Sequence, residues 1–143
     1  MKRRLLTAIC LCAGLVLPAG AFEDVPDGAW YAQAVADVAQ NGYMTGTGAS
    51  TFSPEALVTR ATVVTVLWRL DGAPDAAVAA PFPDVAAGAW YETAAAWAKG
   101  YGIAAGNDKG QFNPNAAVTR QELAVFLWRY AQYKGESLAE GVL

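Results

Sequence analysis

Histidine is absent from this chain of 143 residues, and its only two cysteines, Cys10 and Cys12, lie near the amino terminus. Histidine is the commonest general base and the commonest metal ligand in proteins, so its absence excludes the usual histidine-based catalytic and metal sites. Beyond Cys12 no thiol remains for a disulfide or for a cysteine-held metal. We therefore expect neither a metal site nor a cofactor.

Long hydrophobic runs are also missing, apart from one near the amino terminus. Three basic residues at 2–4 precede an apolar run over 5–17, followed by an A-x-A pattern at 19–21. A bilayer span needs about 20 apolar residues, whereas this shorter run with basic residues before it is typical of a secretory signal peptide. We expect residues 1–21 to be cleaved, leaving a secreted mature chain, 22–143, without a membrane segment.

The mature chain is poor in positive charge. Residues 22–143 hold seven Lys or Arg and all thirteen Asp or Glu, a net charge of −6. Such a chain is repelled by nucleic acid and by anionic membranes, so we expect neither as a partner. An acidic ligand would have to be held by a few well-placed cations.

What the chain does contain is a duplication. When 22–70 is aligned on 82–130 without a gap, 20 of 49 positions are identical, including the words GAWY, VTR and LWR. A segment of small residues, 71–81, joins the two repeats, and a tail, 131–143, follows them. A unit of about 50 residues buries too little surface to be stable alone, so we expect both repeats to share one core.

Each repeat is predicted to contain a loop, a helix, a long loop and a second helix. The first helices are expected to begin near Trp30 and Trp90 and to end at glycine, which accepts the left-handed conformation. The second helices are expected to begin at Thr59 and Thr119, where the spacing of Thr119 and Glu122 predicts a capping box. The following residues are predicted to form the core stripes: Ala34, Val35, Val38, Val63, Val64, Val66, Leu67 and Leu70 in the first repeat, with Ala94, Trp97, Ala98, Leu123, Ala124, Phe126, Leu127 and Tyr130 in the second.

Other positions have mainly structural interpretations. Trp68 and Trp128 fall within the helical stripes and are expected in the core. Arg69 and Arg129 are expected near helix carboxyl ends, where a cation meets the dipole favourably. Gly46 and Gly106 are expected to permit special backbone angles. The segment 106–110 carries too few acids for a calcium loop and is expected to be a turn.

The ordered motifs resemble the S-layer homology repeat. They are FEDV, AWY, NGYMTG, TFSP and VTRAT in the first copy, and FPDV, AWY, YGIAAG, GQFNP and VTRQE in the second. This resemblance implies a mainly α fold of tandem helix–loop–helix repeats, which commonly come in threes and form a pseudo-threefold bundle. Two recognisable copies would give an incomplete bundle. In addition, Thr62 and Ser50 replace the glutamate and glycine found at 122 and 110, so the first repeat departs further from the pattern.

The resemblance also implies a function and a site. Such repeats anchor secreted proteins to the bacterial cell wall without catalysis, usually through a secondary cell wall polysaccharide that often carries a pyruvate ketal. The matching positions for ligand binding are Arg60 and Arg120, together with Trp30 and Trp90. Asp24 and Asp84 fall beside these motifs and complete the candidate ligand-binding set: Arg60, Arg120, Trp30, Trp90, Asp24 and Asp84.

Each candidate ligand-binding residue also has a purely structural interpretation. A guanidinium matches a ketal carboxylate with two parallel hydrogen bonds, which lysine cannot reproduce, but Arg60 and Arg120 could equally be pins to loop acids. On this basis Arg120→Lys is expected to weaken wall binding more than Arg60→Lys. For the two tryptophans, packing of the first helix on the second, with one edge partly exposed, is favoured over stacking on a sugar. For the two aspartates, capping or loop pinning is favoured.

Three functions from different classes therefore stand. The first is a carbohydrate-binding module that anchors at the bacterial cell surface. The second is a secreted assembly module that associates with itself or with related repeat proteins to complete the bundle. The third, a hydrolase with two carboxylates, is disfavoured because most acids fall in linker, tail or capping positions.

Overall fold

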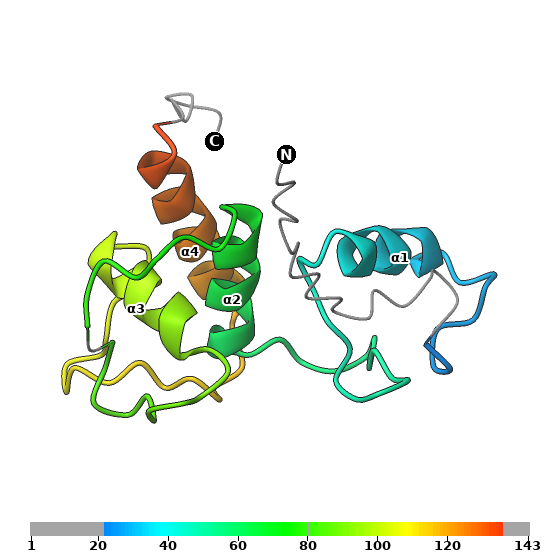
Figure 1. Cartoon of the computed structure of the whole chain (residues 1–143), viewed down its shortest axis with the longest axis horizontal. Coiled ribbons are helices and arrows are strands. Elements are labelled where there is room, and N and C mark those ends of the chain that lie inside the picture. Colours follow the sequence, from blue (N-terminus) through cyan, green and yellow to red (C-terminus); the bar gives the residue numbers. More distant parts are fainter. Residues whose placement is uncertain (1–21, 80, 136–143) are drawn as a thin grey trace, which may run out of the picture. The chain divides into compact units, whose positions relative to one another are not determined.

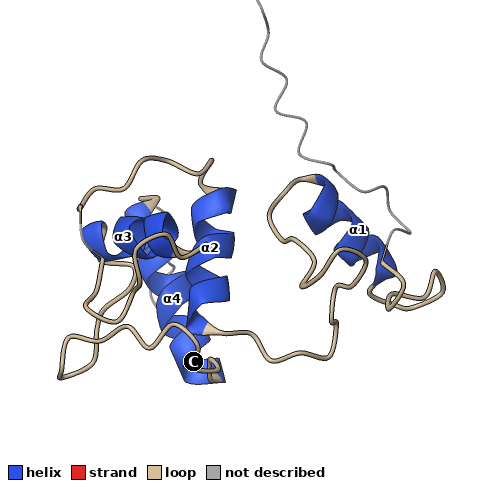
Figure 2. Ribbon diagram, turned by 60° about the horizontal axis from the view of Figure 1, so that its bottom comes forward, coloured by secondary structure: helices blue, strands red, loops and turns tan. Residues whose placement is uncertain are grey.

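The computed structural model describes residues 22–79 and 81–135, which form four helices (Figure 1). They are α1 (Ala32–Gln40), α2 (Arg60–Leu70), α3 (Glu92–Gly100) and α4 (Arg120–Tyr133). Within these described ranges there is no strand (Figure 2), and an isolated antiparallel bridge joins Thr59 and Ala117. The predicted mainly α fold is confirmed.

Two expectations fall partly or wholly outside the described ranges. The predicted signal peptide, 1–21, lies outside them, as does most of the tail, 136–143. None of the helices within 22–79 and 81–135 combines the length and the apolar character that a bilayer crossing requires.

The chain divides into two compact units, and the division falls inside the first repeat, between Phe52 and Ser53. Unit 1 therefore contains α1 with its flanking loops, and its described part is 22–52. Unit 2 combines α2, which belongs to the first repeat, with α3 and α4 from the second. The two repeats thus share the core of unit 2 through α2, whereas α1 belongs to the other unit.

The first helix of each repeat begins two residues after its tryptophan. Tyr31 and Tyr91 occupy the N-cap positions, and neither side chain caps the helix. Gly42 and Gly102, just beyond the helix ends, have φ of +72° and +71°, as the glycine stop signals predict.

The second helices begin where the sequence predicts. Thr59 accepts a hydrogen bond from the Thr62 amide, and Thr119 forms the full capping box with Glu122. Arg69 lies in the last turn of α2, as expected. The expectation for Arg129 is wrong, because α4 continues to Tyr133 and leaves Arg129 one turn inside the helix.

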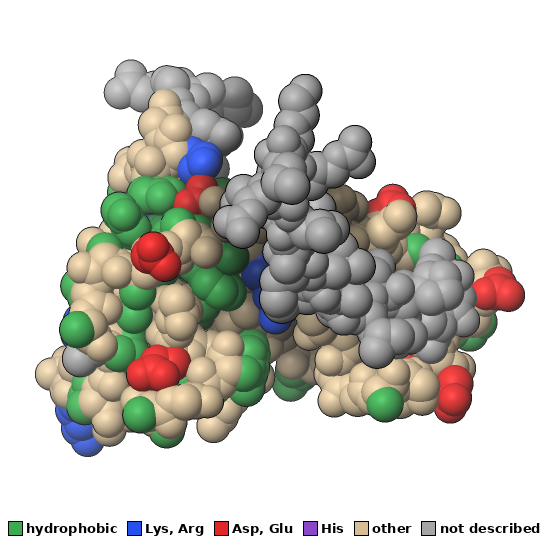
Figure 3. Space-filling view, in the orientation of Figure 1, with side chains coloured by type: hydrophobic (Ala, Val, Ile, Leu, Met, Phe, Trp, Pro, Cys, Tyr) green, Lys and Arg blue, Asp and Glu red, His purple; other side chains and the backbone are tan. Residues whose placement is uncertain are grey.

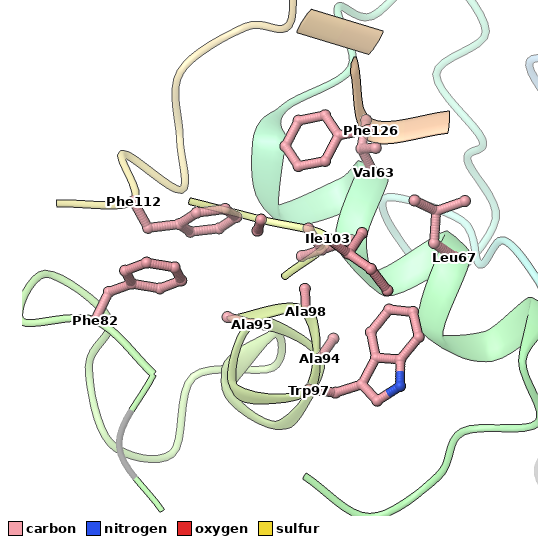
Figure 4. Packing of buried hydrophobic residues seen from close by; sticks show 12 residues of the cluster. Val63, Leu67, Phe82, Ala94, Ala95, Trp97, Ala98, Ile103, Phe112 and Phe126 are labelled. Atoms are coloured by element: carbon pink, nitrogen blue, oxygen red, sulfur yellow. The ribbon is translucent and has the colours of Figure 1, made fainter. Parts of the chain in front are cut away.

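The core of unit 2 lies between α2 and α3 (Figure 4). Val63 and Leu67 of α2 face Trp97 and the alanines of α3, and Val64 belongs to the same buried cluster. The small alanines let the two backbones approach closely. By contrast, α3 reaches α4 of its own repeat through aromatic side chains such as Trp97 and Tyr133, whose rings lie 5.7 Å apart. The first helix of the second repeat therefore packs mainly on the second helix of the preceding repeat.

The predicted core stripe of α4 is largely wrong. Leu123, Leu127 and Trp128 are 41%, 50% and 50% exposed, and only Phe126 of the predicted stripe is fully buried. The physical reason is that α2 is covered by the first helix of the following repeat, whereas no helix of the described part of unit 2 covers α4 in that way. Trp68, the counterpart of Trp128, is half-buried and donates its indole N–H to the Pro74 carbonyl over 2.7 Å.

Further burial differences are smaller. Val35 and the α3 residues are buried as predicted, whereas Ala34 and Leu70 are exposed, contrary to the prediction. Val66, Val38 and Tyr130 are half-buried, and Ala124 is exposed.

Gly46 and Gly106 are required by close backbone approach rather than by special angles. Neither has a positive φ. A Cβ at Gly46 would lie 2.5 Å from the Thr51 carbonyl oxygen, and one at Gly106 would lie 2.7 Å from the backbone of Gly110. The predicted reason is therefore wrong, although both positions do need glycine.

Candidate functional site

Arg60, the first residue of α2, reaches into the long loop of the second repeat. Its Nε donates to the Phe112 carbonyl over 2.7 Å, Nη2 to the Ala105 carbonyl over 3.3 Å, and Nη1 to Glu122 over 3.1 Å. The guanidinium also lies 5.1 Å and 5.2 Å from the ring centroids of Phe112 and Phe126. Its side chain is only 15% exposed. Arg60 is therefore a pin between repeats, although the carboxylate it binds is Glu122 of α4 and not one of the loop acids expected from the sequence.

The aspartate fixes the loop that receives Arg60. Asp84 accepts hydrogen bonds from the amides of Phe112 and Asn113 over 2.8 Å and 2.7 Å. These bonds hold the sharp turn at Asn113, where φ is +55°. Phe112 stacks on Phe82, with ring centroids 5.0 Å apart (Figure 4). The predicted loop-pinning role of Asp84 is confirmed.

The two carboxylates of the site are stabilised in their charged forms. For Asp84, partial desolvation acts in the opposite direction, but the backbone hydrogen bonds and the nearby charge of Arg60 leave its pKa lower than usual. For Glu122, the hydrogen bonds from Thr119 come first and Arg60 adds to them, so its pKa is also lowered. Both groups therefore remain ionised beside the Arg60 guanidinium down to mildly acidic pH.

An open groove of about 260 Å³ lies beside this pin. We call it the Arg60 groove, and it is lined by Arg60, Gln121, Glu122, Val125, Phe126 and Arg129. The five α4 residues lie on one face of that helix because their spacing follows its period. The lining combines two guanidinium groups, one carboxylate, one amide and apolar surface, which suits an anionic polar ligand with a ring or methyl group.

Arg129 was not selected as a site residue from the sequence. It is half-buried, and among residues 22–79 and 81–135 no hydrogen bond or ion pair engages its guanidinium. Arg60 is largely committed to protein, although its guanidinium carries more N–H groups than its three bonds use. The signal that could have found Arg129 is its helical spacing from Glu122 and Val125.

The predicted packing role of Trp30 and Trp90 is wrong. They are 93% and 63% exposed, and each makes an edge-to-face contact with the tyrosine that follows it. The first helices begin two residues later than expected, so the tryptophans stand in the preceding turns instead of on a packed helical face. Neither tryptophan lines the Arg60 groove.

The remaining predicted residues are divided between the units. Asp24, in unit 1, accepts from the Phe52 amide over 2.8 Å and so repeats the role of Asp84. Arg120 is exposed at the start of α4 and does not line the Arg60 groove. The repeat-related arginines are thus in different environments, and the structure brings Arg60, but not Arg120, together with Asp84 and Glu122.

The segment 106–110 is a tight turn, as expected. Asn107 accepts hydrogen bonds from the amides of Lys109 and Gln111, both over 2.9 Å. Nowhere in the described part of the chain do three or more potential metal ligands of the Cys, His, Asp and Glu types gather.

The chain contains two copies of one helix–loop–helix unit, and an arginine of the first copy binds the loop of the second. These features define a helical repeat module. Comparison with known families is consistent with this class. The model of the S-layer homology domain matches residues 21–64 and 81–124, and the chain belongs to this family.

Two relatives contain a similar segment. An endoglucanase of Bacillus sp. (strain KSM-635) is 34% identical over 118 residues, which cover 82% of this chain and 12% of that protein. The surface-layer 125 kDa protein of Lysinibacillus sphaericus is 34% identical over 121 residues, which cover 76% of this chain and 10% of that protein. The chain therefore spans about a tenth of the length of these relatives.

Proposed function

We propose that the protein is a non-catalytic module that attaches to the bacterial cell wall by binding a secondary cell wall polysaccharide in the Arg60 groove. The observation that carries this proposal is the half-buried guanidinium of Arg129, which has no partner among the described residues and lies in a groove with Arg60. The similarity to a surface-layer protein supports a location at the cell surface.

The chemistry of the groove favours an acidic sugar substituent such as a pyruvate ketal. A guanidinium binds a carboxylate through two parallel hydrogen bonds. Arg129 would supply this pair, and the spare N–H groups of Arg60 would add a second donor from the other wall. Val125, which is 44% exposed, provides apolar surface for the ketal methyl group and the ring.

The lining also argues against glycoside hydrolysis at this groove. Glycosidases generally use two carboxyl groups on either side of the scissile bond. The lining holds one, Glu122, and both of its oxygens are already engaged by Thr119 and Arg60. The groove is suited to holding a glycan rather than to cleaving it.

The proposal is tested with purified cell walls, compared before and after removal of their polysaccharide and after removal of pyruvate alone. Arg129→Gln is the informative variant, and Arg69→Gln at the equivalent position of the first repeat is its matched control. Loss of one charge-assisted contact of about 1.5–3 kcal/mol should weaken binding by roughly 10- to 150-fold for Arg129→Gln. The control should bind like the unmodified chain.

Three results would refute this proposal in whole or in part. Binding that survives removal of the polysaccharide means that the ligand is another wall component. Unchanged binding of a folded Arg129→Gln variant means that the glycan is bound outside the Arg60 groove. If binding is lost only when the whole polysaccharide is removed, the acidic group is not the pyruvate ketal.

A further inference from the structure

We propose that α4 binds unit 1 of a second copy of this chain, so that copies associate head to tail. The contact surface on one copy is the face of α4 formed by Arg120, Leu123, Ala124, Leu127 and Trp128, which we call the α4 face. Its partner is the described part of unit 1, residues 22–52, on the other copy. The proposal does not depend on glycan binding.

The first argument is that the same face of α2 is already covered within the chain. The α2 counterparts of the α4 face are Arg60, Val63, Val64, Leu67 and Trp68. Val63, Val64 and Leu67 are buried against the first half of the second repeat, and Arg60 bonds to its loop. At the equivalent positions of α4, Leu123 and Leu127 are exposed. The surface that receives a first-half segment on α2 is therefore present on α4, where no described element of unit 2 covers it.

The second argument is that unit 1, the first half of the first repeat, leaves more exposed the counterparts of the residues that the second repeat buries against α2. Ala94, Ala98 and Phe112 are completely or almost completely buried where the second repeat packs on α2. Their counterparts in unit 1 are less buried: Ala34 is exposed, and Val38 and Phe52 are half-buried. A contact between the α4 face and unit 1 would bury both surfaces, and it would repeat the interface that α2 already forms with the second repeat.

Charge complementarity gives the third argument. Residues 22–52 contain four acids, Glu23, Asp24, Asp27 and Asp37, and no Lys or Arg. The face of unit 1 seen in Figure 3 shows acidic side chains and no basic ones. By contrast, α4 contains Arg120 and Arg129 against a single acid, Glu122. Association of α4 with unit 1 therefore brings opposite charges together.

The partners of Arg120 in the contact between copies can be inferred from those of Arg60, its equivalent in the first repeat. Arg60 donates to the Phe112 carbonyl and lies close enough to Asp84 to lower its pKa. The equivalent partners in unit 1 are the Phe52 carbonyl and Asp24, which already binds the Phe52 amide. Thr62 stands where the second repeat has Glu122. The contact between copies thus lacks one ion pair, and it should be weaker than the contact inside the chain.

The Arg60 groove lies on the other side of α4. Its lining residues Glu122, Phe126 and Arg129 alternate along the helix with Leu123, Leu127 and Trp128 of the α4 face. On a helix these two sets point in different directions. A second copy could therefore occupy the α4 face while the groove stays open.

A head-to-tail contact makes a prediction that a symmetric contact does not. Leu127→Glu should block the α4 face, and Ala34→Glu should block unit 1; both positions are exposed, so both variants should fold. By sedimentation velocity the unmodified chain should form species larger than a dimer as its concentration rises. Each variant alone should be monomeric. An equal mixture of the two should form a dimer and nothing larger, because one intact surface remains on each variant.

Gln132→Glu, a charge change at an exposed α4 position outside the α4 face, is the matched control and should associate like the unmodified chain. A chain that stays monomeric at the highest concentration overturns the proposal, including the case in which unit 1 covers α4 of its own copy. Association that survives Ala34→Glu but not Leu127→Glu also overturns it, because that result indicates a symmetric contact between α4 helices.

Discussion

Replacing Arg60 by lysine should destabilise unit 2, although the charge is kept. Arg60 bonds to the Phe112 and Ala105 carbonyls and to Glu122 from three different nitrogens. These acceptors are spread around a planar fork, and a single ammonium group reaches one of them while leaving two without their partner. Because the Arg60 side chain is 15% exposed, water replaces the lost bonds poorly.

The expected size follows from those two bonds. At about 0.5–1.5 kcal/mol for each hydrogen bond, Arg60→Lys should lower the free energy of unfolding by roughly 1–3 kcal/mol. For a unit of this size about 4–8 °C of Tm corresponds to 1 kcal/mol, so Tm should fall by roughly 5–20 °C. Thermal unfolding followed by circular dichroism measures this change directly.

The duplication provides the control. Arg120→Lys makes the same chemical change at the equivalent position, where the side chain is exposed. Measured at low concentration, it should change stability by less than about 0.5 kcal/mol. Equal effects of the two substitutions would refute the assignment of Arg60 as the pin between repeats. From the sequence, Arg120→Lys was expected to weaken glycan binding more than Arg60→Lys. Because Arg60 lines the groove and Arg120 does not, we expect Arg60→Lys to weaken binding more.

Two further predictions concern the same unit. The lowered pKa values of Asp84 and Glu122 stabilise the fold above their ordinary values of about 4, and this stability is lost as the pH falls through the lowered folded-state values. Tm should therefore stay level from neutral pH to about 5 and fall below about 4, and a decline that begins near pH 6 would contradict this assignment. Gly106→Ala should cost about 1–3 kcal/mol in chemical denaturation, because its Cβ would meet backbone across the loop. Gly28→Ala, with open space around it, should be neutral, and equal costs at both glycines would argue against the close approach.

The sequence predicted the parts of the fold that depend on local chemistry. The capping box of Thr119 and Glu122 involves residues three apart, and the glycine stops depend on a single backbone conformation. The loop-pinning role of Asp84 was also predicted, because an aspartate in a loop readily accepts hydrogen bonds from backbone amides. In these cases either the interacting residues lie close in sequence or the residue type by itself indicates the interaction.

Predictions of burial failed where the partner lies outside the local sequence. The same helical stripe is buried in α2 and exposed in α4, because burial depends on what packs against a helix and not on its own pattern. For the same reason Trp128 is half-exposed although it matches Trp68 in sequence. Arg129 was missed because a favourable interaction with the helix dipole was taken as its structural role, whereas its place in the groove also depends on Arg60 of the other repeat.

The two VTR motifs show why a repeated motif does not carry a fixed role. Arg60 and Arg120 begin equivalent helices, follow equivalent caps and have the same intrinsic chemistry. They differ in their surroundings. Arg60 lies close to the rings of Phe112 and Phe126 and bonds to a loop that Asp84 pins, whereas Arg120 is exposed. A guanidinium that is fixed by one repeat can form a wall of a groove, and one that is not fixed is available to a partner. The position of a repeat along the chain, more than its motif, therefore decides whether its arginine is held by the following repeat, as Arg60 is, or exposed, as Arg120 is.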